Sequence, residues 1–238
     1  MKIALVTGAS RGIGAGVARR LAQEGCTVVV NYHHSEEQAL ALAGEIGGLA
    51  LRADVSDPAQ VFAMVDTVLK KFFQLDILVC NAGVAWQGLT QNMDVGTYRR
   101  VMGTDLDGTF YCCQAVLPQM IRQKRGQIVT ISSMWGQVGG ACEVAYSAAK
   151  AGVIGLTKAL AKEVGPSGIT VNCVAPGVID TEMNRVLGTQ ALAGLAEETP
   201  LERLGTPEDV AGCVSFLCSE AGAFLTGQVI APNGGLVI

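Results

Sequence analysis

Short apolar runs alternate along the chain with longer stretches in which apolar residues recur every three or four positions. The short runs are typical of strands buried on both faces of a parallel sheet, and the longer stretches of amphipathic helices. The short runs lie at residues 2–7, 27–30, 49–53, 75–80, 127–131, 169–174 and 229–230. The helical patterns lie at about residues 12–25, 36–46, 58–73, 95–122, 144–163 and 207–218. This alternation predicts a doubly wound parallel α/β sheet of about seven strands, with helices on both faces and ligands at the carboxyl ends of the strands.

The composition fits one domain. No linker divides the 238 residues, so we expect a single domain over residues 1–238. Only 16% of the residues are charged, against roughly 25% in soluble domains, which favours self-association. No apolar run approaches the ~18 residues of a membrane span and no signal peptide is recognised, so we expect a cytoplasmic protein with no membrane partner. The net charge of −4, without a basic stripe, argues against nucleic acid.

Cysteine and histidine usage restricts the chemistry further. The eight cysteines form no Cys-x-x-Cys motif, and we interpret them as reduced thiols. The only two histidines, His33 and His34, are adjacent. The chain therefore has too few histidines for a histidine-based metal site or for a Ser-His-acid triad, and we expect no metal.

A glycine-rich turn follows the first apolar run. It contains Gly8, Ser10, Arg11, Gly12, Ile13 and Gly14 in the spacing G-x-x-x-G-x-G. Between a strand and a helix, such a turn lets backbone N–H groups bind a pyrophosphate where a Cβ would block close approach. A tight turn without a ligand is the simpler alternative. The turn also matches the G-x-S-x-G elbow of hydrolases, but only Glu24 lies between Ser10 and the last histidine, so the required acid-then-histidine order fails.

The end of the second apolar run bears on the choice of dinucleotide. Enzymes that use NAD commonly place an acid there to bind the ribose 2′-hydroxyl. This chain has Asn31, Tyr32, His33 and His34 instead, with Arg11 in the facing loop. Because no carboxylate repels a 2′-phosphate, these residues favour NADP(H). An exposed polar turn without phosphate contact is the alternative for the two histidines.

Tyr146 and Lys150 lie four residues apart on one face of a predicted helix. A free tyrosine has a pKa of roughly 10, so it is a poor proton shuttle unless a positive charge stabilises its phenolate. Lys150 can supply that charge. Ser133, after the run at 127–131, offers a hydroxyl to a substrate oxygen. A Tyr-x-x-x-Lys pair often occurs on helices by chance, so a catalytic role for this pair depends on the other motifs.

Taken in order, these motifs resemble the short-chain dehydrogenase/reductase family over essentially the whole chain, and most closely its 3-oxoacyl-[acyl-carrier-protein] reductases. The matching segments are Thr7–Gly14, Asp54-Val55, Asn81-Ala82-Gly83, Ser133, Tyr146-x-x-x-Lys150, Asn172–Gly177 with Ile179 and Thr181, and Pro207–Ala211. The resemblance implies a Rossmann-type sheet and a homotetramer in which the helices at 95–122 and 144–163 pack across a two-fold axis.

The resemblance also implies roles for individual residues. Tyr146 would be the general acid, Lys150 would lower its pKa and hold the nicotinamide ribose, and Ser133 would bind the substrate carbonyl. The pyrophosphate of NADP(H) would be held by Gly8, Ser10, Arg11, Gly12, Ile13 and Gly14, and the 2′-phosphate by His33. The adenine would be held by Asp54 and Val55, and the ribose by Asn81, Ala82 and Gly83. The carboxamide would be held by Ile179 and Thr181, with Pro176 and Gly177 in the same loop. Residues 182–200 would form a mobile substrate lid.

Two positions depart from the family pattern. Asp105 stands where the family has a fourth catalytic residue, an asparagine. Lys124 matches one of two basic positions that the family presents to an acyl carrier protein beside the active site, but the other is Ser167. The leading hypothesis is reduction of a 3-oxoacyl thioester by NADPH. The alternatives are the same chemistry on acyl-CoA or another ketone or secondary alcohol, and a catalytically silent dinucleotide-binding subunit.

Overall fold

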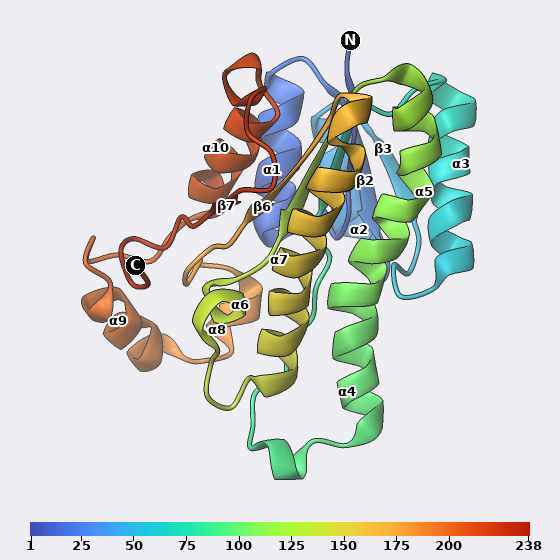
Figure 1. Ribbon diagram of the computed structural model, residues 1–238. Coiled ribbons are helices and arrows are strands. Elements are labelled where there is room, and N and C mark those ends of the chain that lie inside the picture. Colours follow the sequence, from blue (N-terminus) through green and yellow to red (C-terminus); the bar gives the residue numbers. More distant parts are fainter.

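The computed structural model describes residues 1–238 and has a seven-stranded sheet between two layers of helices (Figure 1). The strand order is β3-β2-β1-β4-β5-β6-β7. The strands are β1 (Ile3–Val6), β2 (Thr27–Tyr32), β3 (Leu49–Arg52), β4 (Ile77–Cys80), β5 (Gly126–Ile131), β6 (Ile169–Val174) and β7 (Val229–Ile230). Each strand pairs in parallel with its neighbours, which confirms the predicted doubly wound sheet.

Three long helices pack against each face of the sheet. One layer holds α1 (Gly12–Gln23), α2 (Glu36–Glu45) and α10 (Pro207–Leu217), and the other holds α3 (Pro58–Phe72), α5 (Gly108–Gln123) and α7 (Val144–Val164). A cluster of 24 buried residues lies under the first layer and one of 22 under the second. Because both faces of the sheet are covered, the strands are apolar on both sides, as the short apolar runs predict.

The structure differs from the predicted elements at three places. The stretch at 95–122 is divided into α4 (Val95–Met102), a π-helical turn η2 (Gly103–Asp107) and α5. A short helix α6 (Met134–Val138) follows Ser133, and residues 182–200 contain α8 (Glu182–Arg185) and α9 (Thr189–Glu198). The remaining elements are the 3-10 turns η1 (Thr90–Asn92), η3 (Gly165–Ser167) and η4 (Glu220–Gly222). None of the helices is both long and apolar enough to cross a lipid bilayer, and all eight cysteines are free thiols.

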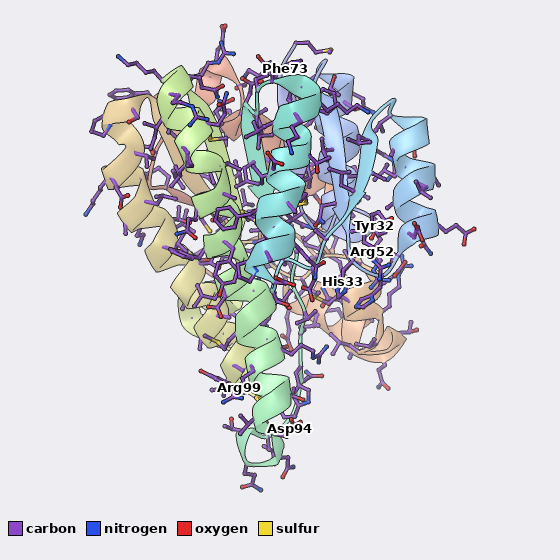
Figure 2. All side chains as sticks on the ribbon, turned by 90° about the vertical axis from the view of Figure 1, so that its right-hand side faces the viewer. Tyr32, His33, Arg52, Phe73, Asp94 and Arg99 are labelled. Carbon is purple, nitrogen blue, oxygen red and sulfur yellow. The ribbon has the colours of Figure 1, made fainter.

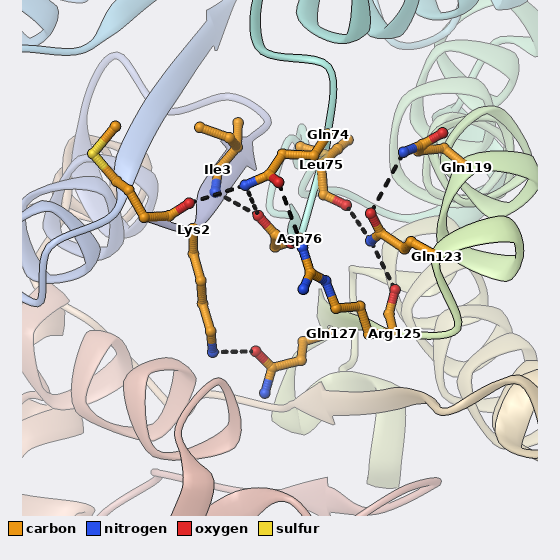
Figure 3. Close-up of polar contacts among 10 residues, drawn as sticks. Lys2, Ile3, Gln74, Leu75, Asp76, Gln119, Gln123, Arg125 and Gln127 are labelled. Carbon is orange, nitrogen blue, oxygen red and sulfur yellow. Dashed lines mark hydrogen bonds and ion pairs between the residues drawn. The ribbon is translucent and has the colours of Figure 1, made fainter.

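Polar contacts close the amino edge of the sheet (Figure 3). The buried Asp76 carboxylate accepts a hydrogen bond of 2.8 Å from the Ile3 N–H and lies 3.4 Å from the Arg125 guanidinium. The Lys2 ammonium donates to the Gln127 side-chain oxygen over 2.9 Å. These contacts join the starts of β1, β4 and β5.

Lys124 lies at this amino edge, because it ends α5 two residues before β5 begins. Ser133 follows the opposite end of the same strand. A strand of six residues spans about 20 Å. Within one chain, Lys124 therefore lies at the edge of the sheet opposite Ser133, and its match to a carrier-binding position stays a prediction.

Candidate active site

Lys150 joins helix α7 to the carboxyl end of β5. Its side chain is only 3% exposed, and its ammonium donates a hydrogen bond of 3.1 Å to the main-chain oxygen of Ile131, the last residue of β5. The ammonium lies 5.5 Å from the centre of the Tyr146 ring. The structure therefore brings the predicted Tyr146 and Lys150 together at the edge of the sheet where ligands bind in this architecture.

Ser133 is the N-cap of α6 and is buried at the same edge. Its Oγ accepts a hydrogen bond of 3.2 Å from the Trp135 N–H. Because a hydroxyl that accepts at one lone pair still has its own proton to donate, the Ser133 O–H is available to a substrate oxygen. The neighbouring Ser132, which the sequence analysis did not single out, donates 2.8 Å to the Lys150 main-chain oxygen and so fixes α7 against β5. The adjacent serines at the strand end are the only signal in the sequence for this contact.

The surroundings of Tyr146 act on its pKa in both directions. Burial raises the pKa, the Lys150 ammonium lowers it, and the Asp105 carboxylate raises it again. The Ser133 hydroxyl also favours the phenolate, but the net pKa of Tyr146 lies above its ordinary value. Lys150 thus lowers the pKa of Tyr146, as expected, but burial raises this pKa by more.

Asp105 reaches the same place from the π-helical turn η2. It has no exposed surface, and its Oδ2 lies 3.1 Å from the Lys150 ammonium. Its Oδ1 accepts a hydrogen bond of 2.8 Å from the Val84 N–H. Burial raises the pKa of Asp105, and Lys150 offsets part of that rise. Burial lowers the pKa of Lys150, but Asp105 and Tyr146 together bring it above its ordinary value.

The glycines of the turn at 8–14 are required by close packing. A Cβ on Gly8, where φ is +59°, would lie 2.8 Å from the Ala82 Cα, and one on Gly14 would lie 2.5 Å from the Asn81 side-chain nitrogen. Gly12 is different, because a Cβ there would meet only the Thr181 side chain, at 3.5 Å. Gly12 (φ +54°) is thus needed for its backbone conformation and not for close packing.

A cleft of about 260 Å³ lies between this turn and the loop after β6. It is lined by Ser10, Arg11, Gly12, Ala15, Gly16, Arg19, Asp180, Thr181, Glu182, Arg185, Pro207 and Glu208. Helix α1 starts here without a side-chain cap and without an acid in its first turn. An uncapped helix N-terminus beside a glycine is a suitable cradle for a pyrophosphate, so these residues fit a dinucleotide. Arg11 itself forms an exposed ion pair with Glu182 over 3.1 Å.

Residues expected at the adenine end meet at the carboxyl edge of β2 and β3. His33 Nδ1 lies 3.7 Å from Asp54 Oδ2, and the His33 and His34 rings stack with their centres 3.7 Å apart. Figure 2 shows Tyr32, His33 and Arg52 gathered at this edge. Strand β2 runs two residues further than predicted, so Tyr32 is buried within it.

Asn31 is buried in the same strand extension. It accepts 3.1 Å from the Gly8 N–H and donates 3.1 Å to the Ala53 oxygen. It therefore supports the glycine turn and does not face a ligand.

Several other expected cofactor residues use their side chains within the protein. The Asn81 amide donates to the main-chain oxygens of Thr7 and Gly8, at 2.9 and 3.0 Å. Val55 and Ile179 are core residues. The remaining expected positions, Ala82, Gly83, Pro176 and Gly177, also follow strand ends at this edge. Here the main chain is what a ligand would meet.

The chain is similar in sequence to several known proteins. The 3-oxoacyl-[acyl-carrier-protein] reductase FabG of Staphylococcus aureus is 44% identical over 240 residues, covering 99% of this chain and 98% of that protein. The Synechocystis 3-oxoacyl-[acyl-carrier-protein] reductase is 43% identical, covering 100% and 97%, and Escherichia coli FabG is 40% identical, covering 99% and 97%. A family model described as enoyl-(acyl carrier protein) reductase matches residues 8–237. The chain belongs to the short-chain dehydrogenase/reductase family. In this family member, the glycine turn, Asn81–Gly83, Ser133 and Pro176-Gly177 all follow strand ends at one edge of the sheet.

Proposed function

We propose that the protein reduces 3-oxoacyl thioesters, carried by acyl carrier protein, to 3-hydroxyacyl thioesters in fatty acid biosynthesis, with NADPH as cofactor. The observation that carries the proposal is the contact between Tyr146 and the buried Lys150, 5.5 Å from ring centre to ammonium, beside the buried Ser133 hydroxyl. The named relatives, 40% to 44% identical over nearly their whole length, support the choice of substrate.

The side chains divide the reaction among them. When bound, NADPH supplies the hydride that adds to the 3-keto carbon. The Ser133 O–H donates a hydrogen bond to the keto oxygen and orients it. Tyr146 donates its phenol proton to that oxygen as negative charge develops on it, which gives the 3-hydroxy product. Since the pKa of Tyr146 is raised, the phenol holds this proton at neutral pH, and the Lys150 ammonium stabilises the phenolate that remains.

The cofactor would lie across the carboxyl edge of the sheet. The α1 N-terminus and the main chain of Gly12 would receive the pyrophosphate. Arg11 and His33 would read the 2′-phosphate, and the absence of an acid at the end of β2 favours NADP(H) over NAD(H). Lys150 would hold the nicotinamide ribose.

One of the family's two carrier-binding positions is uncharged in this chain. The family's basic carrier-binding positions correspond to Lys124 and Ser167 here, and Lys124 lies at the opposite edge of the sheet from Ser133 in the same chain. The uncharged Ser167 favours, as the second candidate, the same reduction on a coenzyme A thioester, which needs no protein docking surface.

We also propose that the protein assembles as a homotetramer through α5 and α7. Both helices carry exposed large apolar side chains on their outer faces, such as Phe110 and Val144. Apolar side chains in water on a chain with few charges are typical of surfaces that pack against another subunit.

Oxidation of NADPH and of NADH by the purified protein, followed by absorbance with acetoacetyl carrier protein and acetoacetyl-CoA, tests the reaction. We expect faster reduction of the carrier-protein thioester with NADPH. Tyr146→Phe should lower kcat by roughly 10²- to 10⁴-fold, because it removes the general acid, while the matched Tyr111→Phe should leave it unchanged. A protein that oxidises neither cofactor with either thioester would support the catalytically silent alternative.

A further inference from the structure

Asp105 and Lys150 form an ion pair that is sealed from water. The exposed fraction is 0% for Asp105 and 3% for Lys150, and Oδ2 and Nζ are 3.1 Å apart. No well-aligned hydrogen bond reaches Oδ2, so the contact is chiefly between charges. A Cβ on Gly83 would lie 2.9 Å from Oδ2 and 3.2 Å from Nζ, so the main chain covers the pair closely.

The pose of the Asp105 side chain suits a carboxylate and not an amide. The Val84 N–H donates to Oδ1 over 2.8 Å, which fixes that atom as an acceptor. An asparagine in the same pose would therefore turn its NH₂ group toward the Lys150 ammonium. Since both groups only donate hydrogen bonds, they would repel each other. Asparagine and aspartate are thus not equivalent at this position, although their shapes are nearly the same.

We propose that Asp105 is a positioning residue: it holds the Lys150 ammonium and cancels much of its field at Tyr146, so that the phenol keeps its proton to higher pH than it would beside Lys150 alone. The mechanistic consequence rests on the proposed function, but the charge relation between the three side chains does not. The protonated phenol is the form that donates a proton during ketone reduction. Alcohol oxidation needs the phenolate, so Asp105 favours the reductive direction and confines oxidation to alkaline pH.

The other charged groups around the site do not replace Asp105. Glu143, one turn before Tyr146, also raises the pKa of the phenol, but its effect is smaller than that of Asp105. Arg100 on α4 acts on Asp105 more weakly than Lys150 does. The Cys173 thiol faces Lys150, and burial raises its pKa, so it stays neutral. Asp105 is therefore the charge that opposes Lys150.

Titration of the Tyr146 phenol in the ligand-free protein tests this directly. The absorbance difference between the unmodified protein and Tyr146→Phe, followed against pH, isolates this tyrosine from the other three. We expect its pKa at or above the ordinary value of roughly 10. In Asp105→Asn, titrated against Asp105→Asn with Tyr146→Phe, we expect the pKa to fall by about one unit, because removal of a like charge near an acid has an effect of that size.

Asp107→Asn is the matched control, since Asp107 lies in the same π-helical turn but is exposed and forms no ion pair. It should leave the titration unchanged. Where the proposed reaction is also observed, the pH profile of alcohol oxidation should shift to lower pH in Asp105→Asn and not in Asp107→Asn.

Two outcomes would overturn the proposal. One is an unmodified protein whose Tyr146 titrates well below 10, a measurement that needs no variant at position 105. The other is an Asp105→Asn protein that has the melting temperature of the unmodified protein but shows no shift in the pKa of Tyr146. Neither depends on turnover, so a failure of the proposed function would be recognised separately as an absence of NADPH oxidation.

Discussion

Arg11 Nη1 lies 3.1 Å from Glu182 Oε2, so an ion pair links the glycine-rich turn to the first residue of α8. Arg11 is also the side chain proposed to read the 2′-phosphate. The Glu182 carboxylate neutralises part of the charge that the guanidinium would offer to a phosphate. The phosphate and the start of the predicted lid therefore compete for one charge.

This competition predicts opposite effects for two substitutions. Glu182→Gln should tighten NADPH binding by up to about fivefold, because an exposed ion pair is worth at most roughly 1 kcal/mol. Arg11→Ala should weaken NADPH binding by about ten- to a hundredfold and leave NADH nearly unchanged, since it removes a charge-assisted contact to phosphate. Fluorescence titration with both dinucleotides measures these affinities. Glu208→Gln, a residue of the same cleft without an ion pair, is the control. Equal affinities for NADPH and NADH in the unmodified protein would show that Arg11 does not read the 2′-phosphate.

Much of the fold could be predicted because buried strands leave a clear pattern. Strand β6 was predicted at 169–174 and has those bounds in the structure. The helix starts were equally legible where capping side chains are present. Asp57 accepts a hydrogen bond of 2.9 Å from the Ala59 N–H at the start of α3, and Thr206 with Asp209 forms a capping box at the start of α10.

The π-helical turn could not be predicted, because five residues are too few to shift the period of a helical pattern visibly. The sequence showed that Asp105 departs from the family, but only the turn shows why the carboxylate reaches Lys150. The place of Lys124 in the fold, in contrast, could be predicted. Lys124 stands two residues before β5, which puts it at the amino edge of a parallel sheet.

The capping box at the start of α10 predicts a pH-dependent contribution to stability. Asp209 receives hydrogen bonds of 2.7 and 3.0 Å from the Arg203 guanidinium, which holds the pKa of that carboxyl at about 2. The unfolded value is roughly 3.9, so the contribution is fully present above that pH and is lost as the pH falls toward 2.

Asp209→Asn should therefore lower the free energy of unfolding by roughly 1 kcal/mol at pH 7, the usual value of a helix cap. The difference from the unmodified protein should shrink as the pH falls below about 4. Urea unfolding at a series of pH values measures both. A difference that persists undiminished at the lowest pH would mean that the charge of Asp209 contributes nothing.

The proposed assembly predicts that a charge on α5 separates the subunits. Phe110 is exposed on α5, and Phe62 is comparably exposed on α3, in the same layer of helices. Phe110→Glu should convert the homotetramer to smaller species, because burying an unpaired carboxylate in an apolar interface is costly. Phe62→Glu should leave the assembly intact. Sedimentation velocity at micromolar concentration distinguishes the species, and a monomer in the unmodified protein would disprove the tetramer.

Gly83 offers a test of how tightly the Asp105–Lys150 ion pair is held. A Cβ at this position would lie 2.9 Å from Asp105 Oδ2 and 3.2 Å from Lys150 Nζ, and both side chains are buried. Gly83→Ala should lower the free energy of unfolding by about 1 to 3 kcal/mol, the usual range for overpacking. It should also reduce kcat more than it raises KM for the thioester, because the displaced ammonium supports Tyr146 during the reaction.

Gly44 on α2 is the matched control for this substitution. A Cβ there would meet nothing within 4 Å, and Gly44 lies inside a helix. Gly44→Ala should therefore stabilise the protein by roughly 0.5 to 1 kcal/mol, because alanine loses less conformational freedom than glycine when a helix forms. Urea unfolding and steady-state kinetics of the two variants separate the contact at Gly83 from the general effect of replacing a glycine. If Gly83→Ala is as stable and as active as Gly44→Ala, the main chain at Gly83 does not confine the Asp105–Lys150 pair.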